Sequence, residues 1–369
     1  MHFSHLQYVP CLRWKQGEYQ ALLRLDDATQ QALTPLIEVP GIGWDFENQR
    51  EARTIDEHLA SFPKRVHRKW KSRASFVDLN HIHPSERMSN GYHPVRFVFD
   101  GLRAFGCSSV PVTGLDRDKQ YQQEVKEVMA IDKVGACLRV GIEIAAKSSF
   151  KPQVDSLLSI LKARPTNCDF ILDLGAPSFL PIEGFARVLQ TIIGALAHLG
   201  EWRTLSLIGT AFPYTMGEIK KEAQIVARYE WMLYKTLIAA LDRSGLRLPA
   251  FGDYGIAHPS VPPADMRLVK PFAKIRYTIN DAWYIVKAKN VRDEKYGGFE
   301  QYRELCGRIM SSRHYCGPTY SWGDARIAQC ASGTGSTGNL TTWVQVDTNH
   351  HAEKVVRDIS SFYGSSSTP

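Results

Sequence analysis

Acidic side chains follow several short apolar segments of the chain, each at the point where the segment ends. Five of them are Glu38, Asp78, Glu143, Asp173 and Asp253. If these segments are parallel strands of one barrel, their carboxyl ends meet at one face, and the carboxylates gather there. Carboxylates so close together repel one another and resist ionisation unless a positive charge compensates them. These five are therefore the candidate catalytic residues, together with His351 near the C-terminus.

Basic residues near the same segments could supply the compensating charge. Arg13 and Lys15 follow the first apolar segment, Arg139 lies within the fifth, and Lys274 and Arg276 lie in a later alternating segment. The charges can form a structural ion-pair network, a site for a substrate or effector, or a catalytic metal centre. The sequence leaves these three alternatives open, and a divalent metal is the one cofactor that the pattern suggests.

Histidine and amide side chains extend the list of candidates. Asn80 opens the segment Asn80-His81-Ile82-His83, and a His-x-His pair can bind one metal. The same segment can be a polar loop, because the spacing fixes no third ligand. His350 and His351 are adjacent, and adjacent helical residues point about 100° apart. One of the two can therefore face a site while the other faces away.

The segment 320–326 places an aromatic residue, a glycine and an acid before a predicted helix. Asp324 can cap that helix, and Trp322 can cover a site or anchor the C-terminal segment. We assign Arg13, Lys15, Asn80, Arg139, Lys274, Arg276, Trp322, Asp324 and His350 as candidate ligand-binding residues. The chain has no GxSxG, HExxH, P-loop or GxGxxG motif, so the commonest hydrolase, zincin and nucleotide-binding signatures are missing.

The elements that must position these residues alternate along the chain. Strands are predicted at 7–12, 34–39, 74–79, 109–113, 136–142, 169–174, 205–210 and 248–254. Helices are predicted between them, at 17–25, 51–71, 93–105, 119–131, 151–163, 182–199 and 218–243. Eight such alternations in roughly 250 residues predict a (β/α)8 barrel with an α/β fold. An open doubly wound sheet is the structural alternative, but it lacks its glycine-rich fingerprint here.

The pattern changes after the eighth strand. Residues 272–290 predict a β-hairpin that turns at Asn280-Asp281, and residues 299–312 predict a helix that could close the barrel. We expect 1–313 to form the barrel with its hairpin insertion, and 314–363 to form a mostly helical tail that packs on the barrel mouth. The glycine-rich segment 331–339 predicts a flexible linker, and 364–369 should be disordered.

Composition limits the cellular setting and the kind of partner. No apolar run is long enough to cross a membrane, and no signal peptide is evident. The seven cysteines are scattered, which favours free thiols and a cytoplasmic location. The net charge is +7, and the densest basic run spans residues 64–73. That run is either a solvated helix end or a phosphate-binding patch.

Several segments resemble one family. The opening YVPCLRWKQGEYQAL, then TPLIEVP, FVDL, FILDLG, SWGDARI and the ending GNLTTWVQVDTNHH are similar to the beta family of phage, satellite-phage and prophage proteins. The resemblance covers essentially the whole chain, and its motif order is close to the beta member of a gop–beta–cII operon. It implies a role in anti-phage defence, with gop-like and cII-like proteins as partners, but it carries over no catalytic assignment.

Three functions remain open at this point. The first is a barrel component of a toxin–antitoxin-like defence system that binds and controls a partner protein and senses a ligand at the barrel mouth. The second is an enzyme, a metal-dependent hydrolase or phosphodiesterase, that acts on a phosphorylated or nucleotide-like ligand at the acidic rim. The third is a nucleic-acid-binding module that uses the basic run 64–73.

Overall fold

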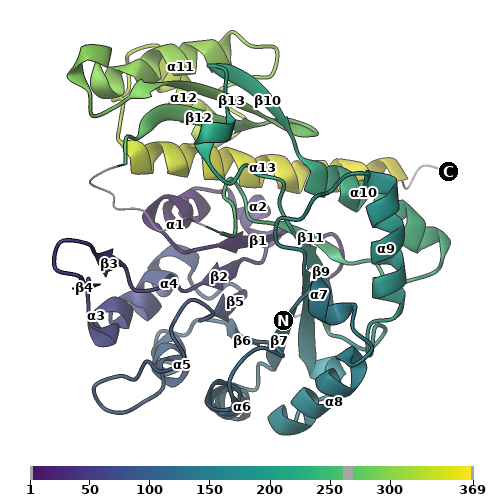
Figure 1. Ribbon diagram of the computed structural model, residues 1–369. Helices are drawn as coiled ribbons and strands as arrows, with labels where there is room; N and C mark the ends of the chain where they lie inside the picture. Colours follow the sequence, from purple (N-terminus) through teal and green to yellow (C-terminus); the bar gives the residue numbers. More distant parts are fainter. Residues whose placement is uncertain (1–2, 261–268, 367–369) are drawn as a thin grey trace.

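The computed structural model describes residues 3–260 and 269–366, and its centre is a closed barrel of eight parallel strands (Figure 1). The strands are β1 (Val9–Leu12), β2 (Leu36–Glu38), β5 (Ser75–Asp78), β6 (Ser109–Thr113), β7 (Ala136–Gly141), β8 (Cys168–Asp173), β9 (Thr204–Ile208) and β11 (Ala250–Asp253). Each barrel strand pairs with the next one along the chain, and β1 closes the ring against β11. The predicted barrel is therefore confirmed.

Amphipathic helices cover the outside of the barrel. They are α1 (Gln16–Leu23), α4 (Phe62–Trp70), α5 (Pro94–Ala104), α6 (Lys119–Asp132), α8 (Phe150–Leu161), α9 (Ile182–Gly194) and α10 (Tyr229–Arg243). In α5 the buried residues Val95, Val98, Phe99 and Leu102 recur every three or four positions, so one stripe faces the strands. The loops hold α2 (Asp27–Gln31), α3 (Ile55–Leu59), α7 (Ile142–Ala145), β3 (Trp44–Asp45) and β4 (Arg50–Glu51).

Strand alternation separates two layers of core. Leu36, Phe76 and Ile171 belong to the cluster inside the barrel. The alternate residues Ile37 and Val77 belong to the larger cluster between the strands and the outer helices. Successive side chains of a strand point to opposite faces, so this parity decides which strand-end residues look into the barrel mouth.

A second unit lies over one side of the barrel (Figure 1). It contains β10 (Ala223–Ala227), β12 (Phe272–Thr278), β13 (Ala282–Asn290), α11 (Gln301–Met310) and α12 (Trp322–Ala331). The three strands form an antiparallel sheet in the order β10-β13-β12, and the sheet shares an apolar core with α11 and α12. The predicted hairpin 272–290 is confirmed. The hairpin was expected as an insertion within the barrel unit 1–313, and it instead belongs to the separate sheet of this second unit.

Two helix predictions are wrong, one beside the second unit and one in the barrel. The helix expected at 218–243 begins only at Tyr229, because residues 223–227 pair with β13 as strand β10. The helix expected at 51–71 is broken into α3 and α4. The helix expected to close the barrel is α11, and it packs against β12 and β13 instead.

The C-terminal helix α13 (Leu340–Ser366) completes the barrel wall. It crosses the outside of β1 and β11, where His351 meets Asp253, and it reaches α10 through the hydroxyls of Tyr234 and Tyr363, 2.8 Å apart. Toward its start it packs closely on α1. The expected tail at the barrel mouth is thus a helix on the barrel side, in the place of the eighth outer helix.

The ends of this region also differ from expectation. Residues 364–366 continue α13 although 364–369 were expected to be disordered, and 367–369 lie outside the described residues. The expected linker 331–339 is a short fixed turn, in which the Thr337 carbonyl accepts a hydrogen bond from the Trp343 indole at 2.8 Å. All seven cysteines have free thiols.

Candidate functional site

Arg139 is the centre of the charge network at the barrel mouth. It extends from β7 into the barrel, and its Nη1 donates to Glu38 at 2.7 Å and to Asp78 at 2.9 Å. Its Nε donates to Asp173 at 2.9 Å, and its Nη2 donates to the Tyr254 hydroxyl at 3.0 Å. Each of the three guanidinium nitrogens therefore has at least one acceptor, and one cation compensates three strand-end acids.

The three acids meet because of parity and register. Glu38 and Asp78 are direct neighbours in the β2–β5 pairing, and both share the inward face with Leu36 and Phe76. Asp173 occupies the same inward position at the end of β8. Parallel neighbours that end in carboxylates on the same face leave those carboxylates side by side. The sequence prediction that rim acids gather with Arg139 therefore holds for these three.

Further basic groups surround Glu38. The His81 ring nitrogen lies 3.2 Å from its carboxylate, and Arg13 lies 3.9 Å away at the edge of the network. Burial alone would raise the pKa of Glu38. The hydrogen bond from His81 and the charge of Arg139 outweigh burial and lower the pKa to about 2.

Two residues of the network escaped the sequence analysis. Arg117 lies 3.2 Å from Asp78, and its buried Nε has no hydrogen-bond partner among the described residues. The Tyr254 hydroxyl donates to Asp173 at 2.7 Å. Burial and the neighbouring Asp173 charge raise the pKa of Tyr254 well above its usual value. Arg117 follows β6, whose end carries no acid, so no local signal marked it.

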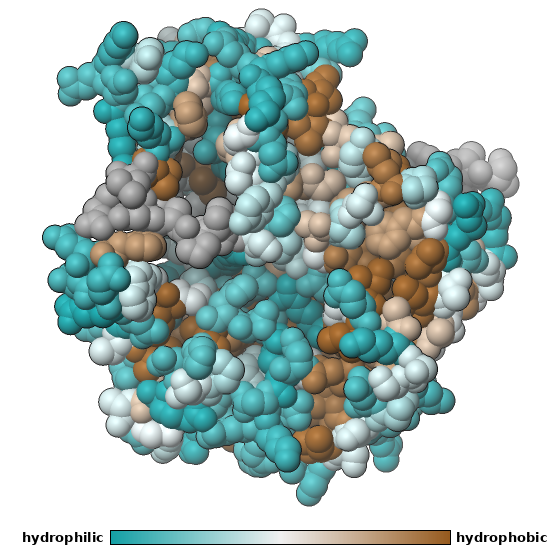
Figure 2. Space-filling view, viewed as in Figure 1, coloured by the Kyte–Doolittle hydropathy of each residue, from teal (hydrophilic) through white to brown (hydrophobic). Residues whose placement is uncertain are grey.

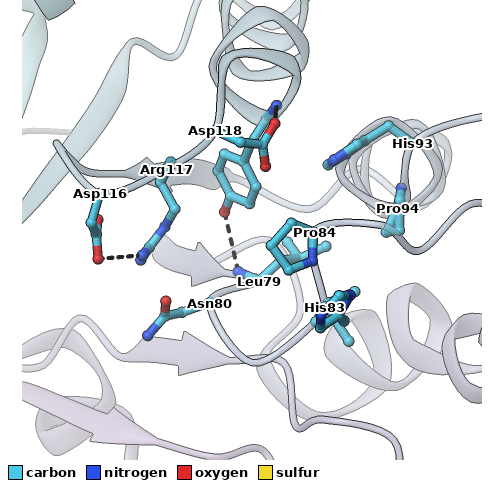
Figure 3. Close-up of a pocket in the computed structure, with 11 residues that line it drawn as sticks. Leu79, Asn80, His83, Pro84, His93, Pro94, Asp116, Arg117 and Asp118 are labelled. Carbon is cyan, nitrogen blue, oxygen red and sulfur yellow. Dashed lines mark hydrogen bonds and ion pairs between the residues drawn. The ribbon is translucent and has the colours of Figure 1, made fainter.

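A small cavity of about 130 Å³ opens beside Arg117 (Figure 3). Asn80 and Asp116 lie on one side of it, while His83 and His93 lie on the other. Figure 2 shows hydrophilic residues gathered over the middle of the barrel face, below the second unit. The backbone N–H of Asn80 also donates to Asp78 at 3.0 Å, which ties the cavity wall to the network.

Asp253 and His351 lie outside this network. Asp253 lies on the outward face of β11. Its carboxylate contacts His351 at 2.9 Å and the Tyr8 hydroxyl at 2.6 Å. Burial alone would raise the pKa of Asp253, but His351 holds it below its usual value. The inward residue at this strand end is Tyr254. Both groups are fully buried between the barrel and α13, so the expectation that they face the mouth is wrong.

Asp324 and His350 form a second buried pair, 2.8 Å apart, inside the second unit. Asp324 also accepts the Tyr277 hydroxyl at 2.6 Å, and the His350 ring stacks on Tyr277 with centroids 3.8 Å apart. Ser321, not Asp324, caps α12. Trp322 packs under Arg24, 4.3 Å from its ring centroid, and covers no part of the mouth network. These residues join α12 to β12 and α13.

The remaining candidates are also separate from the rim acids. Arg276 binds Asp347 of α13 at 2.7 Å, and burial lowers the pKa of the neighbouring Lys274 to about 8. Glu143 is exposed in α7, and Lys15 lines a different pocket beside α1. The sequence therefore identified the network around Arg139 but also included residues that serve other contacts.

The arrangement of the network bears on metal binding. Arg139 stands between the carboxylates, where a divalent cation would otherwise lie, and the described residues contain no cluster of three or more metal-ligating side chains. His81 and His83 do not converge, because His81 faces Glu38 and His83 bonds Ser85 at 2.7 Å. Among the possibilities left open by the sequence, the geometry fits an ion-pair network with a binding cavity at its edge.

The family model for beta proteins matches residues 8–357 of this chain. The chain belongs to the beta protein family. No curated protein sequence is significantly similar to it. Membership of this beta family confirms the resemblance noted in the sequence, and the match extends from β1 through most of α13.

Solved structures that resemble this beta protein share little sequence with it. Active domain 2 of a chitinase from Pyrococcus furiosus is 7% identical, with a TM-score of 0.36 over 68% of this chain and 84% of that chain. A glycoside hydrolase family 5 enzyme from Prevotella bryantii is 10% identical, with a TM-score of 0.33 over 65% and 79%. Neither likeness bears on function. No helix in the described part of the chain is long and apolar enough to cross a membrane.

Proposed function

We propose that this beta protein is the ligand-sensing component of an anti-phage defence system and that it restrains a partner protein. The observation that carries the sensing role is the bridging of three carboxylates by Arg139 at the open end of the barrel. Such a network holds no free carboxylate pair for acid–base chemistry. An anionic ligand can instead compete with the carboxylates for the arginines, and that exchange would rearrange the side chains at the barrel mouth.

The partners in this proposal are gop-like and cII-like proteins encoded beside the chain, as the family resemblance implies. Arg13 and Arg117 at the edge of the network, the latter with an unpartnered Nε, are suited to receive an anion. A phosphorylated ligand is the class that arginine forks recognise best. The cytoplasm is the compartment in which such a system acts on an infecting phage.

Co-expression with both neighbours tests the proposal. A tagged wild-type chain should retain the gop-like protein on purification and protect cells from phage. Arg139→Lys keeps the charge but loses the planar fork, so it should weaken protection while the protein stays folded. Arg187→Gln, on the exposed face of α9, is the matched control and should behave as wild type. Protection that needs neither neighbour, or that Arg139→Lys leaves intact, would contradict the proposal.

A second candidate is a hydrolase or phosphodiesterase acting on a nucleotide-like ligand, with a divalent metal that would be held mainly by the phosphates of the ligand, because the described residues contain no cluster of three metal-ligating side chains. The cavity beside Arg117 favours it, because His83 and Asp116 line the same space and can exchange protons. Hydrolysis of bis(p-nitrophenyl) phosphate with added Mg²⁺ or Mn²⁺ tests this activity. Loss of hydrolysis in Asp116→Asn, but not in the exposed variant Arg187→Gln, would support it over the binding role.

A further inference from the structure

A second pocket lies beside the barrel mouth, between α1, α4 and the loop after β2. It has a volume of about 420 Å³, and its walls come from the first two strand–helix loops of the barrel. Three aromatic side chains line it: Trp14, Tyr19 and Phe62. Its volume is within the range of small-molecule sites and is larger than a lone phosphate group needs.

The charged side chains that line this pocket are all basic; Glu18, which does not line it, accepts a hydrogen bond from the Lys15 backbone N–H at 3.0 Å. Lys15, Arg53 and Arg65 line it, and no aspartate or glutamate does. In residues 3–260 and 269–366, no carboxylate lies within ion-pair distance of these three cations. The Arg65 guanidinium lies over the Tyr19 ring, 5.5 Å from its centroid. Unpaired cations beside aromatic faces are the features that bind a phosphorylated compound with a flat ring.

Trp14 gives an independent sign of a binding site. It directly follows Arg13 at the end of β1, it is 1% exposed, and its indole N–H has no acceptor among the described residues. Its φ of 52° lies in the left-handed region, which is costly for a residue with a large side chain. A buried unpartnered donor and a strained backbone at the functional face of a barrel together indicate a residue kept for a ligand.

We propose that this pocket binds a mononucleotide, with the phosphate between Arg53 and Lys15 and the base against the partly exposed ring of Tyr19, while Trp14 forms the buried wall of the pocket. The site is separate from the Arg139 network, and the inference does not depend on a defence role. The two sites share the loop after Glu38. A Cβ at Gly41 would lie 2.9 Å from the His81 carbonyl, so the pocket wall packs directly on a residue of the mouth network.

Isothermal titration of the full chain with adenosine 5′-monophosphate, adenosine and inorganic phosphate tests the site. The monophosphate should bind more tightly than either fragment. Arg53→Gln should weaken monophosphate binding about 10-fold or more and leave adenosine binding unchanged, as expected when one charge-assisted contact is lost. Arg68→Gln is the matched control, because Arg68 is exposed on α4 and does not line the pocket.

Three results would overturn the assignment. One is no heat of binding for any of the three compounds at millimolar concentration. Another is equal weakening by Arg53→Gln and Arg68→Gln. The third is tighter, steeply salt-dependent binding of a short oligonucleotide that Arg68→Gln also weakens, which would place the contact on the basic surface of α4. Because Arg53 is exposed and unpaired, its replacement should leave thermal unfolding unchanged, so a loss of binding cannot come from unfolding.

Discussion

Replacement of Arg139 by methionine removes the one cation that bridges Glu38, Asp78 and Asp173. Each carboxylate is buried or nearly so, and together they would remain close in a low-dielectric barrel mouth. Breaking a buried ion pair from one side typically costs about 3–5 kcal/mol. We expect Arg139→Met to lower the free energy of unfolding by that amount at pH 7.

The pH dependence follows from Glu38. Its pKa is lowered from 4.5 to about 2, and at about 1.4 kcal/mol per pH unit this gives the folded state about 3 kcal/mol. A carboxyl group whose pKa is lowered by folding stabilises the folded state fully at pH values above its pKa in the unfolded chain. This stabilisation is lost as the pH falls from about 4.5 toward 2. In Arg139→Met the pKa of Glu38 should rise. The loss of unfolding free energy caused by Arg139→Met should therefore become smaller as the carboxyl groups become protonated.

Urea unfolding between pH 7 and pH 3, followed by circular dichroism, measures this penalty. Arg103→Met is the control, because the Arg103 guanidinium is 33% exposed and pairs with Asp100 and Asp132 outside the barrel mouth, so its loss should cost about 1 kcal/mol or less for each pair. Adding Asp173→Asn to Arg139→Met should restore part of the stability. A penalty that stays constant across this pH range, or that equals the Arg103→Met penalty, would refute the electrostatic reasoning.

Two further predictions concern α13, and a third concerns α11. Truncation after Ala331 should leave no cooperatively folded barrel, because α13 fills the place of the eighth outer helix; a native circular dichroism spectrum and melting transition in the truncated chain would contradict this. Gly17→Ala should destabilise the protein by about 1–3 kcal/mol, since its Cβ would lie 2.5 Å from Val344. Gly307→Ala, in a helix with open space around it, should instead stabilise by up to about 1 kcal/mol in the same thermal melts.

The sequence predicted the barrel because each strand is a short apolar run and each helix has its own amphipathic stripe. It predicted that Glu38, Asp78 and Asp173 gather at the rim, because each lies two positions after an apolar residue of its own strand. Residues two positions apart on a strand point to the same face, so an inward apolar residue implies an inward acid. That rule fails at β11, where Asp253 and Tyr254 are adjacent and either can face inward. The outward position of Asp253 is fixed by Tyr8 and His351, which are distant in the sequence.

Strand β10 shows a different limit. Residues 223–227 continue the helical spacing of apolar residues in α10, so local periodicity predicts one long helix. The segment forms a strand because all five of its residues pair with β13, from Ala223 opposite Val286 to Ala227 opposite Ala282. The partner strand lies about 60 residues later in the chain, so the local sequence of residues 223–227 cannot predict this pairing.

The connection between the two units follows from α13. Its first half supplies Trp343 and Val346 to the core of the second unit, while Ala352, Val355 and Ile359 belong to the main barrel core. Between them, His350 binds Asp324 of the second unit and His351 binds Asp253 of the barrel. One rigid helix is therefore part of both cores. A displacement of the second unit relative to the barrel would therefore disrupt the packing of α13 in one of the two cores.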